Sequence, residues 1–297
     1  MQTETLQGII PPMVTPFRAD DTLDEEAFRN DVSYLIETAG VHGLAVTGST
    51  GEGHTLTDAE VRALTSWAVD EAAGRVPIIT GIITDSTRSA IERGKAVADL
   101  GVAALQVTPV HYLFRPDDDA MLLHFDALCT GTGMPVIIYN VVPWTYLSPA
   151  LLTRLIDSVE GVVGVKQSAG DMKLLADLLL LAGDRARIMS AVDALLFPSF
   201  MLGAHGAIAA ILTAVPTLCL ALWEACQQGD HHAAGELHRK LLVIWNAMLA
   251  DNLPANTKFA MKFQGRDGGL PRAPMPPTSE AQAEAIVRAL EQAGLTG

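Results

Sequence analysis

The chain has little positive charge. Its 297 residues include 20 Lys or Arg against 34 Asp or Glu, a formal net charge of −14. The few basic residues do not cluster, so the basic stripe of a nucleic-acid-binding protein is missing. The acidic excess would also be repelled by an anionic membrane surface. We therefore expect neither a nucleic acid nor a membrane as a partner.

Cysteines and long apolar runs are also scarce. Cys129, Cys219 and Cys226 are too few for a disulfide framework, and all lie in apolar segments that suit buried, reduced thiols. The N-terminal MQTETLQG lacks the basic start and apolar core of a signal peptide. The longest candidate membrane segment, Leu174–Ala182, contains Asp177 and is too short to span a bilayer. These features favour a cytoplasmic enzyme.

What is present is a regular alternation of apolar runs and helical patterns. Hydrophobic residues make up 49% of the chain, which suits parallel strands buried on both faces. The predicted strands are Gly8–Thr15, Gly43–Thr47, Val76–Ile82, Ala103–Thr108, Pro135–Asn140, Val162–Gln167, Ala186–Ala191 and Gly206–Leu212. Eight strand–helix units predict an α/β fold, a closed TIM (β/α)₈ barrel over residues 1–225. A purely helical pattern over residues 226–297 predicts a C-terminal helical extension.

Several local signals mark the starts of the predicted helices. Thr57 followed by Glu60 fits a capping box, and Ser148 before Pro149 fits a capping hydroxyl ahead of a first-turn proline. The acidic run Asp117–Asp119 could suggest a metal cluster. We interpret it instead as carboxylates at the positive end of a helix, and we expect no metal and no cofactor. Neither GxGxxG nor GxxxxGK[ST] occurs, so the common nucleotide-binding folds lose their main support.

Catalytic groups of TIM barrels lie at the C-terminal ends of the strands. Lys166 ends the apolar run that begins at Val162, where a solvated charge is unexpected. Burial disfavours the ammonium and so favours a neutral, nucleophilic amine. A lysine that reaches solvent or a neighbouring carboxylate is the alternative that local sequence leaves open.

Two further strand ends carry polar groups. Tyr139 ends another apolar run and could relay protons beside a lysine, although a buried tyrosine more often only packs and forms a hydrogen bond. Gly48, Ser49, Thr50 and Gly51 form a strand-to-helix loop whose free amides and hydroxyls could hold a carboxylate. An ordinary connecting loop is the alternative.

Together these residues resemble the dihydrodipicolinate synthase / N-acetylneuraminate lyase family of class I aldolases. The similar motifs occur in the family's order along nearly the whole chain. They are Thr15–Phe17, Gly48–Glu52 with Leu56–Thr57, Thr108–Pro109, Tyr139–Asn140, Gly164–Lys166, Gly203–Gly206 and Asn256–Met261. The resemblance implies a TIM barrel with a C-terminal helical bundle, and a homotetramer built as a dimer of dimers.

The resemblance also implies roles for individual residues. Lys166 matches the lysine that forms a Schiff base with a 2-oxo acid, and Tyr139 matches the tyrosine that moves protons to and from the reacting oxygen. Ser49 and Thr50 match the hydroxyl pair that holds the substrate carboxylate and helps to relay protons. Ile208 matches a residue whose backbone lines the lysine's pocket.

The sequence departs from the family at the distal end of the substrate. Where the synthases have an arginine that binds the aldehyde's carboxylate, this chain has Trp144. The family's Thr-Pro-Tyr-Tyr is Thr108-Pro109-Val110-His111 here, so the tyrosine that the synthases insert into a partner subunit's site is absent in register, although Tyr112 is adjacent. Of the polar groups with which the lyases bind sugar hydroxyls, only Asp193 remains, while Ala194 and Ala210 occupy other matching places.

The resemblance implies a lyase of the aldolase or dehydratase type that acts on pyruvate or a related 2-oxo acid, and the departures predict that the distal group of the substrate is apolar or lacks a carboxylate. The alternative within the family is 4-hydroxy-tetrahydrodipicolinate synthase, which condenses pyruvate with aspartate semialdehyde, with His111 or Tyr112 in the missing role. An alternative of another class is a non-catalytic barrel that binds a metabolite. An amine nucleophile argues against it, because binding alone does not need one.

Overall fold

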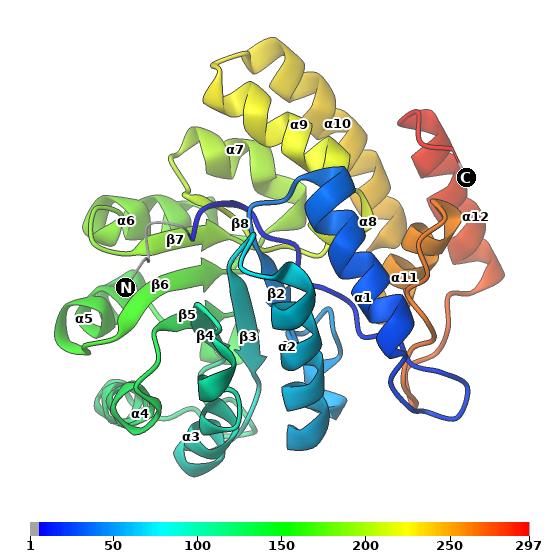
Figure 1. The fold of residues 1–297 in the computed structure, drawn as a ribbon. Coiled ribbons are helices and arrows are strands. Elements are labelled where there is room, and N and C mark those ends of the chain that lie inside the picture. The colour runs from blue at the N-terminus through cyan, green and yellow to red at the C-terminus, as the bar shows by residue number, and fades with distance from the viewer. Residues whose placement is uncertain (1–5, 297) are drawn as a thin grey trace.

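The computed structural model describes residues 6–296. Residues 1–5, part of the N-terminal segment examined for a signal peptide, lie outside them. Eight parallel strands form one sheet in the order β1-β8-β7-β6-β5-β4-β3-β2. Their bounds are β1 Gly8–Ile9, β2 Leu44–Val46, β3 Ile78–Ile82, β4 Ala104–Val107, β5 Val136–Asn140, β6 Val162–Gln167, β7 Arg187–Ser190 and β8 Gly206–Ala207. Figure 1 shows these strands at the centre, with helices around them.

The sheet closes through the residues that follow β1. Pro12 and Ala45 form a parallel bridge, the Met13 amide donates to the Ala45 carbonyl (2.8 Å), and the Ala45 amide donates to the Pro11 carbonyl (3.0 Å). The strand predicted over Gly8–Thr15 is much shorter in the structure, because prolines have no N–H to donate to a ladder. The predicted TIM barrel is confirmed.

Helices surround the barrel and continue beyond it. Their bounds are α1 Glu25–Ser33, α2 Asp58–Ala72, α3 Thr87–Lys95, α4 Asp118–Thr132, α5 Pro149–Ser158, α6 Met172–Ala182, α7 Leu196–Met201, α8 Ile211–Ala214, α9 Pro216–Gln227, α10 His231–Met248, α11 Leu253–Phe263 and α12 Glu280–Gln292. The capping box of Thr57 and Glu60 is present. Asp117 caps α4 by accepting from the Ala120 amide, which confirms its structural interpretation.

The last predicted strand was wrong at its C-terminal end. Gly206–Leu212 was expected to be extended, but β8 ends at Ala207 and α8 begins at Ile211. All residues of α8 are buried. A short apolar run fits a buried strand and a buried helical turn equally well, so the sequence pattern could not separate them.

The core has two layers. The larger lies between the strands and the surrounding helices. The smaller fills the barrel with inward-facing side chains, namely Leu6, Ile10, Ala45, Ile79, Ala104, Ile137, Met189 and Ile208. Side chains alternate between the two faces of a strand, so each strand contributes to both layers. The barrel interior is therefore a packed floor beneath the C-terminal ends of the strands.

The last helices pack together on one side of the barrel, where Figure 1 shows α9 and α10 side by side. Helix α10 also contacts α12, and α11 contacts α8 and α12. The domain boundary predicted at residue 225 falls within α9 and remains a prediction. Within residues 6–296, no helix is long and apolar enough to cross a membrane.

Candidate active site

A cavity of about 260 Å³ lies at the C-terminal ends of the strands. It is lined by Ser49, Thr50, Tyr139, Val141, Lys166, Ser168, Ala191, Asp193, Ile208, Ala209, Ala210, Leu253 and Pro254. The structure thus brings together six residues that the sequence singled out from five different strand ends, namely Ser49, Thr50, Tyr139, Lys166, Asp193 and Ile208.

Lys166 and Tyr139 are neighbours because β5 and β6 pair in a register that sets them side by side. The Lys166 side chain is only 3% exposed, and its Nζ lies 3.7 Å from the centroid of the Tyr139 ring. A ring face at this distance attracts an ammonium group, and it holds the amine in place. In residues 6–296, Lys166 forms no ion pair, so the alternative of a lysine bound to a neighbouring carboxylate loses support.

Asp193 is a second ionisable group in the cavity. Burial raises the pKa of its carboxyl to about 6, while the Ile211 amide and the charge of Lys166 act in the opposite direction. Its Oδ1 accepts a hydrogen bond of 2.7 Å from that amide. A carboxyl with a pKa of about 6 exchanges its proton closer to neutral pH than an ordinary aspartate does, which suits an acid or base in catalysis.

Ser49 and Thr50 lie in a tight loop between β2 and α2. The Glu52 amide donates to the Ser49 carbonyl, and the Gly53 amide donates to the Gly48 carbonyl, each at 3.0 Å. Thr50 is 9% exposed. The loop folds back on itself, which presents both hydroxyl residues to the cavity while Gly48 stays outside the lining.

The other predicted substrate-binding residues lie outside the cavity lining. Trp144 is 65% exposed, and its indole Nε1 donates to the His111 carbonyl at 2.8 Å. The His111 ring Nδ1 lies 3.1 Å from the Pro109 carbonyl, and Tyr112 is 74% exposed with its amide bound to Asp85. Trp144 therefore ties together the loops that follow β4 and β5.

Sequence reasoning missed part of the wall. Leu253 and Pro254, at the start of α11, line the cavity although they are far from any strand end. Tyr146, which lies outside the lining, was also missed; burial raises the pKa of its phenol, and Tyr139 adds to the effect. The only available signal was the family motif Asn256–Met261, which marked α11 without giving it a role.

No group of three or more His, Cys, Asp or Glu within residues 6–296 is arranged to hold a metal ion. His231 and His232 are exposed at the start of α10, on the protein surface. The donors in the cavity are instead one amine, one carboxyl and several hydroxyls. Such a set suits covalent and proton-transfer chemistry at an organic substrate.

Comparisons with known proteins agree with this geometry. The model of the Dihydrodipicolinate synthetase family matches residues 5–293. The chain belongs to this family. A 4-hydroxy-tetrahydrodipicolinate synthase of Methanopyrus kandleri is 34% identical over 293 residues, which cover 98% of this chain and 97% of that protein.

Two solved structures of the dihydrodipicolinate synthetase family share the fold. YagE, a prophage protein of Escherichia coli solved in complex with pyruvate, has a TM-score of 0.92 at 28% identity, covering 98% of this chain and 99% of YagE. A dihydrodipicolinate synthase described as the first monomeric variant has a TM-score of 0.93 at 26% identity, covering 99% of this chain and 98% of that one.

Membership of the dihydrodipicolinate synthetase family settles the class of protein. The chain is an enzyme, a lyase that works through a Schiff base. The alternative of a barrel that only binds a metabolite is therefore set aside.

Proposed function

We propose that Lys166 forms a Schiff base with pyruvate or a related 2-oxo acid, that Tyr139 transfers the proton, and that Ser49 and Thr50 bind the substrate carboxylate. The observation that carries the proposal is the buried Lys166–Tyr139 pair, with its 3.7 Å contact, in one cavity with the two hydroxyl residues. The likeness to YagE, solved with pyruvate, supports it.

The chemistry follows from the groups in the cavity. The Lys166 nitrogen forms a bond to the ketone carbon, the carbonyl oxygen leaves as water, and an iminium remains. Its positive nitrogen accepts the electron pair released when a neighbouring carbon loses a proton or breaks a carbon–carbon bond, which gives an enamine. Tyr139 gives a proton to the departing oxygen and takes one back.

The substrate carboxylate needs a local binding group, because the net charge of −14 repels anions. The hydroxyls of Ser49 and Thr50 supply donors on the same cavity wall. A carboxylate held there fixes the ketone carbon relative to the amine. Holding the reacting atoms in fixed positions raises the reaction rate as much as the basicity of the nucleophile does.

The distal part of the substrate is apolar or lacks a carboxylate. Small apolar side chains of Ala191, Ala209 and Ala210 line the cavity together with Val141. Lys166 is the only basic side chain among the described residues that line it. A second carboxylate would find no guanidinium there, and the carboxyl of Asp193 would repel it when ionised.

The synthase reaction is the second candidate, favoured by the Methanopyrus kandleri relative, which is a 4-hydroxy-tetrahydrodipicolinate synthase. Aspartate semialdehyde carries a carboxylate, so the synthase activity needs a cationic or donor group at the distal end. His111 and Tyr112 lie outside the cavity lining of a single chain.

We also infer a homo-oligomer, with a tetramer as the expected form. Four large apolar side chains are exposed on the loops that follow β4 and β5, namely Tyr112, Leu113, Phe114 and Trp144, at 65% to 77% exposure. Several large apolar side chains exposed on neighbouring loops are typical of protein interfaces. A family member described as monomeric makes sedimentation analysis of this chain necessary.

The substrate class is tested by steady-state turnover with pyruvate and two sets of aldehydes. One set is aspartate semialdehyde, and the other comprises neutral and aromatic aldehydes, each also offered as its 2-oxo acid adduct for cleavage. The proposal expects efficient turnover of the neutral or aromatic set and little of the semialdehyde. Efficient use of aspartate semialdehyde by the unmodified protein would restore the synthase alternative.

A further inference from the structure

Two of the family-like motifs, Thr15–Phe17 and Asn256–Met261, have no role in the proposed chemistry, and both contact the loop that carries Ser49 and Thr50. The hydroxyl of Thr15 donates to the Gly51 carbonyl at 2.6 Å. Glu52 closes the loop, and its carboxylate accepts a hydrogen bond of 2.7 Å from Lys258 in α11. Glu52 and Lys258, which are 206 residues apart in the sequence, are therefore joined directly beside the substrate-binding hydroxyls.

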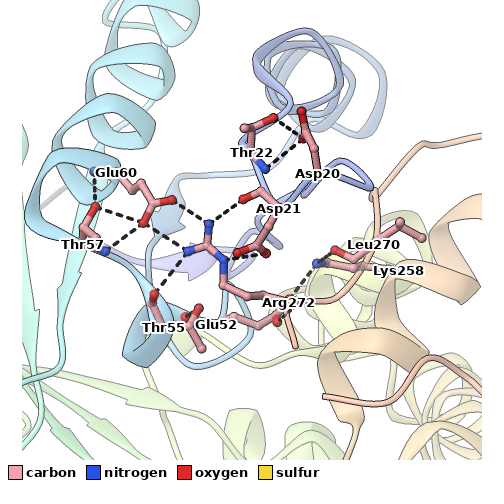
Figure 2. Close-up of polar contacts among 10 residues, drawn as sticks. All are labelled: Asp20, Asp21, Thr22, Glu52, Thr55, Thr57, Glu60, Lys258, Leu270 and Arg272. Carbon is pink, nitrogen blue, oxygen red and sulfur yellow. Dashed lines mark hydrogen bonds and ion pairs between the residues drawn. The ribbon is translucent and has the colours of Figure 1, made fainter. Parts of the chain in front are cut away.

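The Glu52–Lys258 pair is buried on both sides. The side chain of Glu52 is 0% exposed and that of Lys258 is 3% exposed. The second carboxylate oxygen of Glu52 accepts from the Arg272 amide at 2.9 Å, and Lys258 also donates to the Leu270 carbonyl at 2.6 Å. Figure 2 shows these contacts between the loop and the C-terminal extension. A buried pair with its remaining hydrogen-bonding capacity filled holds one geometry.

Arg272 extends this network toward the surface. Its guanidinium donates to Glu60 at 2.6 Å and to Asp21 at 3.0 Å, as Figure 2 shows. The Phe17 ring lies beneath both cations, 4.0 Å from the Arg272 guanidinium carbon and 4.9 Å from Lys258 Nζ. The barrel start, the loop and the C-terminal extension are therefore held as one unit.

The loop itself is strained. Thr47, with φ of 58°, and Glu52, with φ of 56°, both adopt the left-handed conformation although neither is glycine. Residues in this region persist only where their surroundings fix them. The pair with Lys258 supplies such a constraint at Glu52, and the Thr47 hydroxyl bound to the Gly81 carbonyl supplies one at the other end.

Helix α11 contacts both the cavity wall and the loop of Ser49 and Thr50. Its first turn places Leu253 and Pro254 in the cavity wall, and Lys258 lies one turn further along the same helix. The hydrogen bond from Lys258 to Glu52 therefore links the helix that supplies the apolar wall to the loop that carries the two hydroxyls.

We propose that Glu52 and Lys258 are positioning residues through which α11 fixes the loop of Ser49 and Thr50, and thereby sets the selectivity of the site for a substrate carboxylate. The inference rests on the proposed function, because it assigns carboxylate binding to Ser49 and Thr50.

The test compares imine formation with two ketones in the full chain. Pyruvate carries a carboxylate, whereas acetone does not, and borohydride reduction traps the adduct of either at Lys166. In Lys258→Met, and in the double variant Glu52→Gln with Lys258→Met, the half-saturating pyruvate concentration should rise by about tenfold or more. The half-saturating acetone concentration should stay unchanged, because acetone has no carboxylate for the loop of Ser49 and Thr50 to bind.

The double variant separates positioning from stability. Lys258→Met alone leaves a buried unpaired carboxylate, which destabilises the fold, while the double variant removes both charges and should recover thermal stability but not pyruvate selectivity. The matched control is the other buried pair between barrel and extension, Asp31 and Arg266, each 5% exposed and 2.7 Å apart. Asp31→Asn with Arg266→Met should leave the pyruvate-to-acetone ratio at the wild-type value.

The outcomes distinguish the two proposals. Failure to trap pyruvate at Lys166 in the unmodified protein overturns the proposed function and this inference with it. Normal trapping in the unmodified protein, combined with a wild-type pyruvate-to-acetone ratio in the folded double variant, overturns only the positioning role. An equal loss for both ketones would also overturn it, because a purely structural role affects both alike.

Discussion

Tyr139 and Lys166 are register partners on neighbouring strands, and the amine lies over the face of the tyrosine ring rather than at its hydroxyl. The contact that holds the amine is therefore separate from the group that would carry the proton. This separation makes the two roles open to independent tests.

Tyr139→Phe keeps the ring face beside Lys166 and removes only the hydroxyl. Loss of a proton-transfer group costs about 10²–10⁴-fold in rate, so turnover should fall by that amount. The imine with pyruvate should still be trapped, because the amine stays in place. Steady-state kinetics and mass spectrometry measure the two effects, and near-normal turnover would contradict the proposed role of Tyr139.

Asp193→Asn should change the pH dependence of stability. The folded pKa of Asp193, about 6, lies above the ordinary value of 3.8, so its protonated form is favoured in the folded state. The stability that this group contributes is present below pH 3.8 and is lost as the pH rises through about 6. Above that pH, the variant should be more stable than the wild type by on the order of 2–3 kcal/mol.

Denaturant unfolding of the Asp193→Asn variant and the wild type at several pH values checks this expectation. The difference in free energy of unfolding between the variant and the wild type should narrow as the pH falls from about 7.5 toward about 4. A difference that stays constant with pH, or a wild type that is more stable than the variant at about pH 7.5, would rule out a buried carboxyl with a raised pKa.

Gly53→Ala should disrupt the loop that carries Ser49 and Thr50. A Cβ at Gly53 would lie 1.9 Å from the Thr47 carbonyl oxygen, a backbone atom that cannot move away without moving the loop. We expect a loss of about 1–3 kcal/mol in stability, together with weaker trapping of pyruvate. Gly170→Ala is the control, because its Cβ would meet nothing within 4 Å, and it should match the wild type in both measurements.

Trp144→Ala tests the distal end of the substrate. The side chain is 65% exposed, so its removal should cost little stability, about 0.5 kcal/mol or less. It should release the His111 loop, since the indole donates to the His111 carbonyl. We expect the ratio of kcat/KM between aromatic and small aldehydes to change about tenfold, or 1.4 kcal/mol. An unchanged ratio would mean that Trp144 only ties the two loops together.

The sequence was sufficient for the barrel and for the centre of the site. Apolar runs ending in Tyr139 and Lys166 predicted two strand ends, and parallel strands in a barrel bring such ends to one face. The predicted bounds Val162–Gln167 agree with β6 because a strong apolar run defines them. The helix start predicted at Ser148 and Pro149 agrees with α5 because a capping hydroxyl and a proline at the first helical position define it.

The parts that could not be predicted depend on long-range contacts. Nothing local in Leu253 or Pro254 indicates a cavity wall, because their position is set by the packing of α11 on the barrel. Glu52 and Lys258 each lie in a family-like motif, but nothing in the sequence indicates that the fold buries them together as an ion pair. Trp144 shows the converse, since alignment with an arginine suggests a cavity position but the side chain is exposed in the single chain.

The most direct test of the account is the reduction of a pyruvate adduct by borohydride, followed by peptide mass spectrometry. We expect a stable added mass on Lys166, and no added mass in Lys166→Ala or in Lys166→Arg, because arginine stays protonated. Both variants should also lose turnover. An unmodified Lys166 peptide in the wild type, with pyruvate binding demonstrated independently, would contradict the Schiff-base assignment.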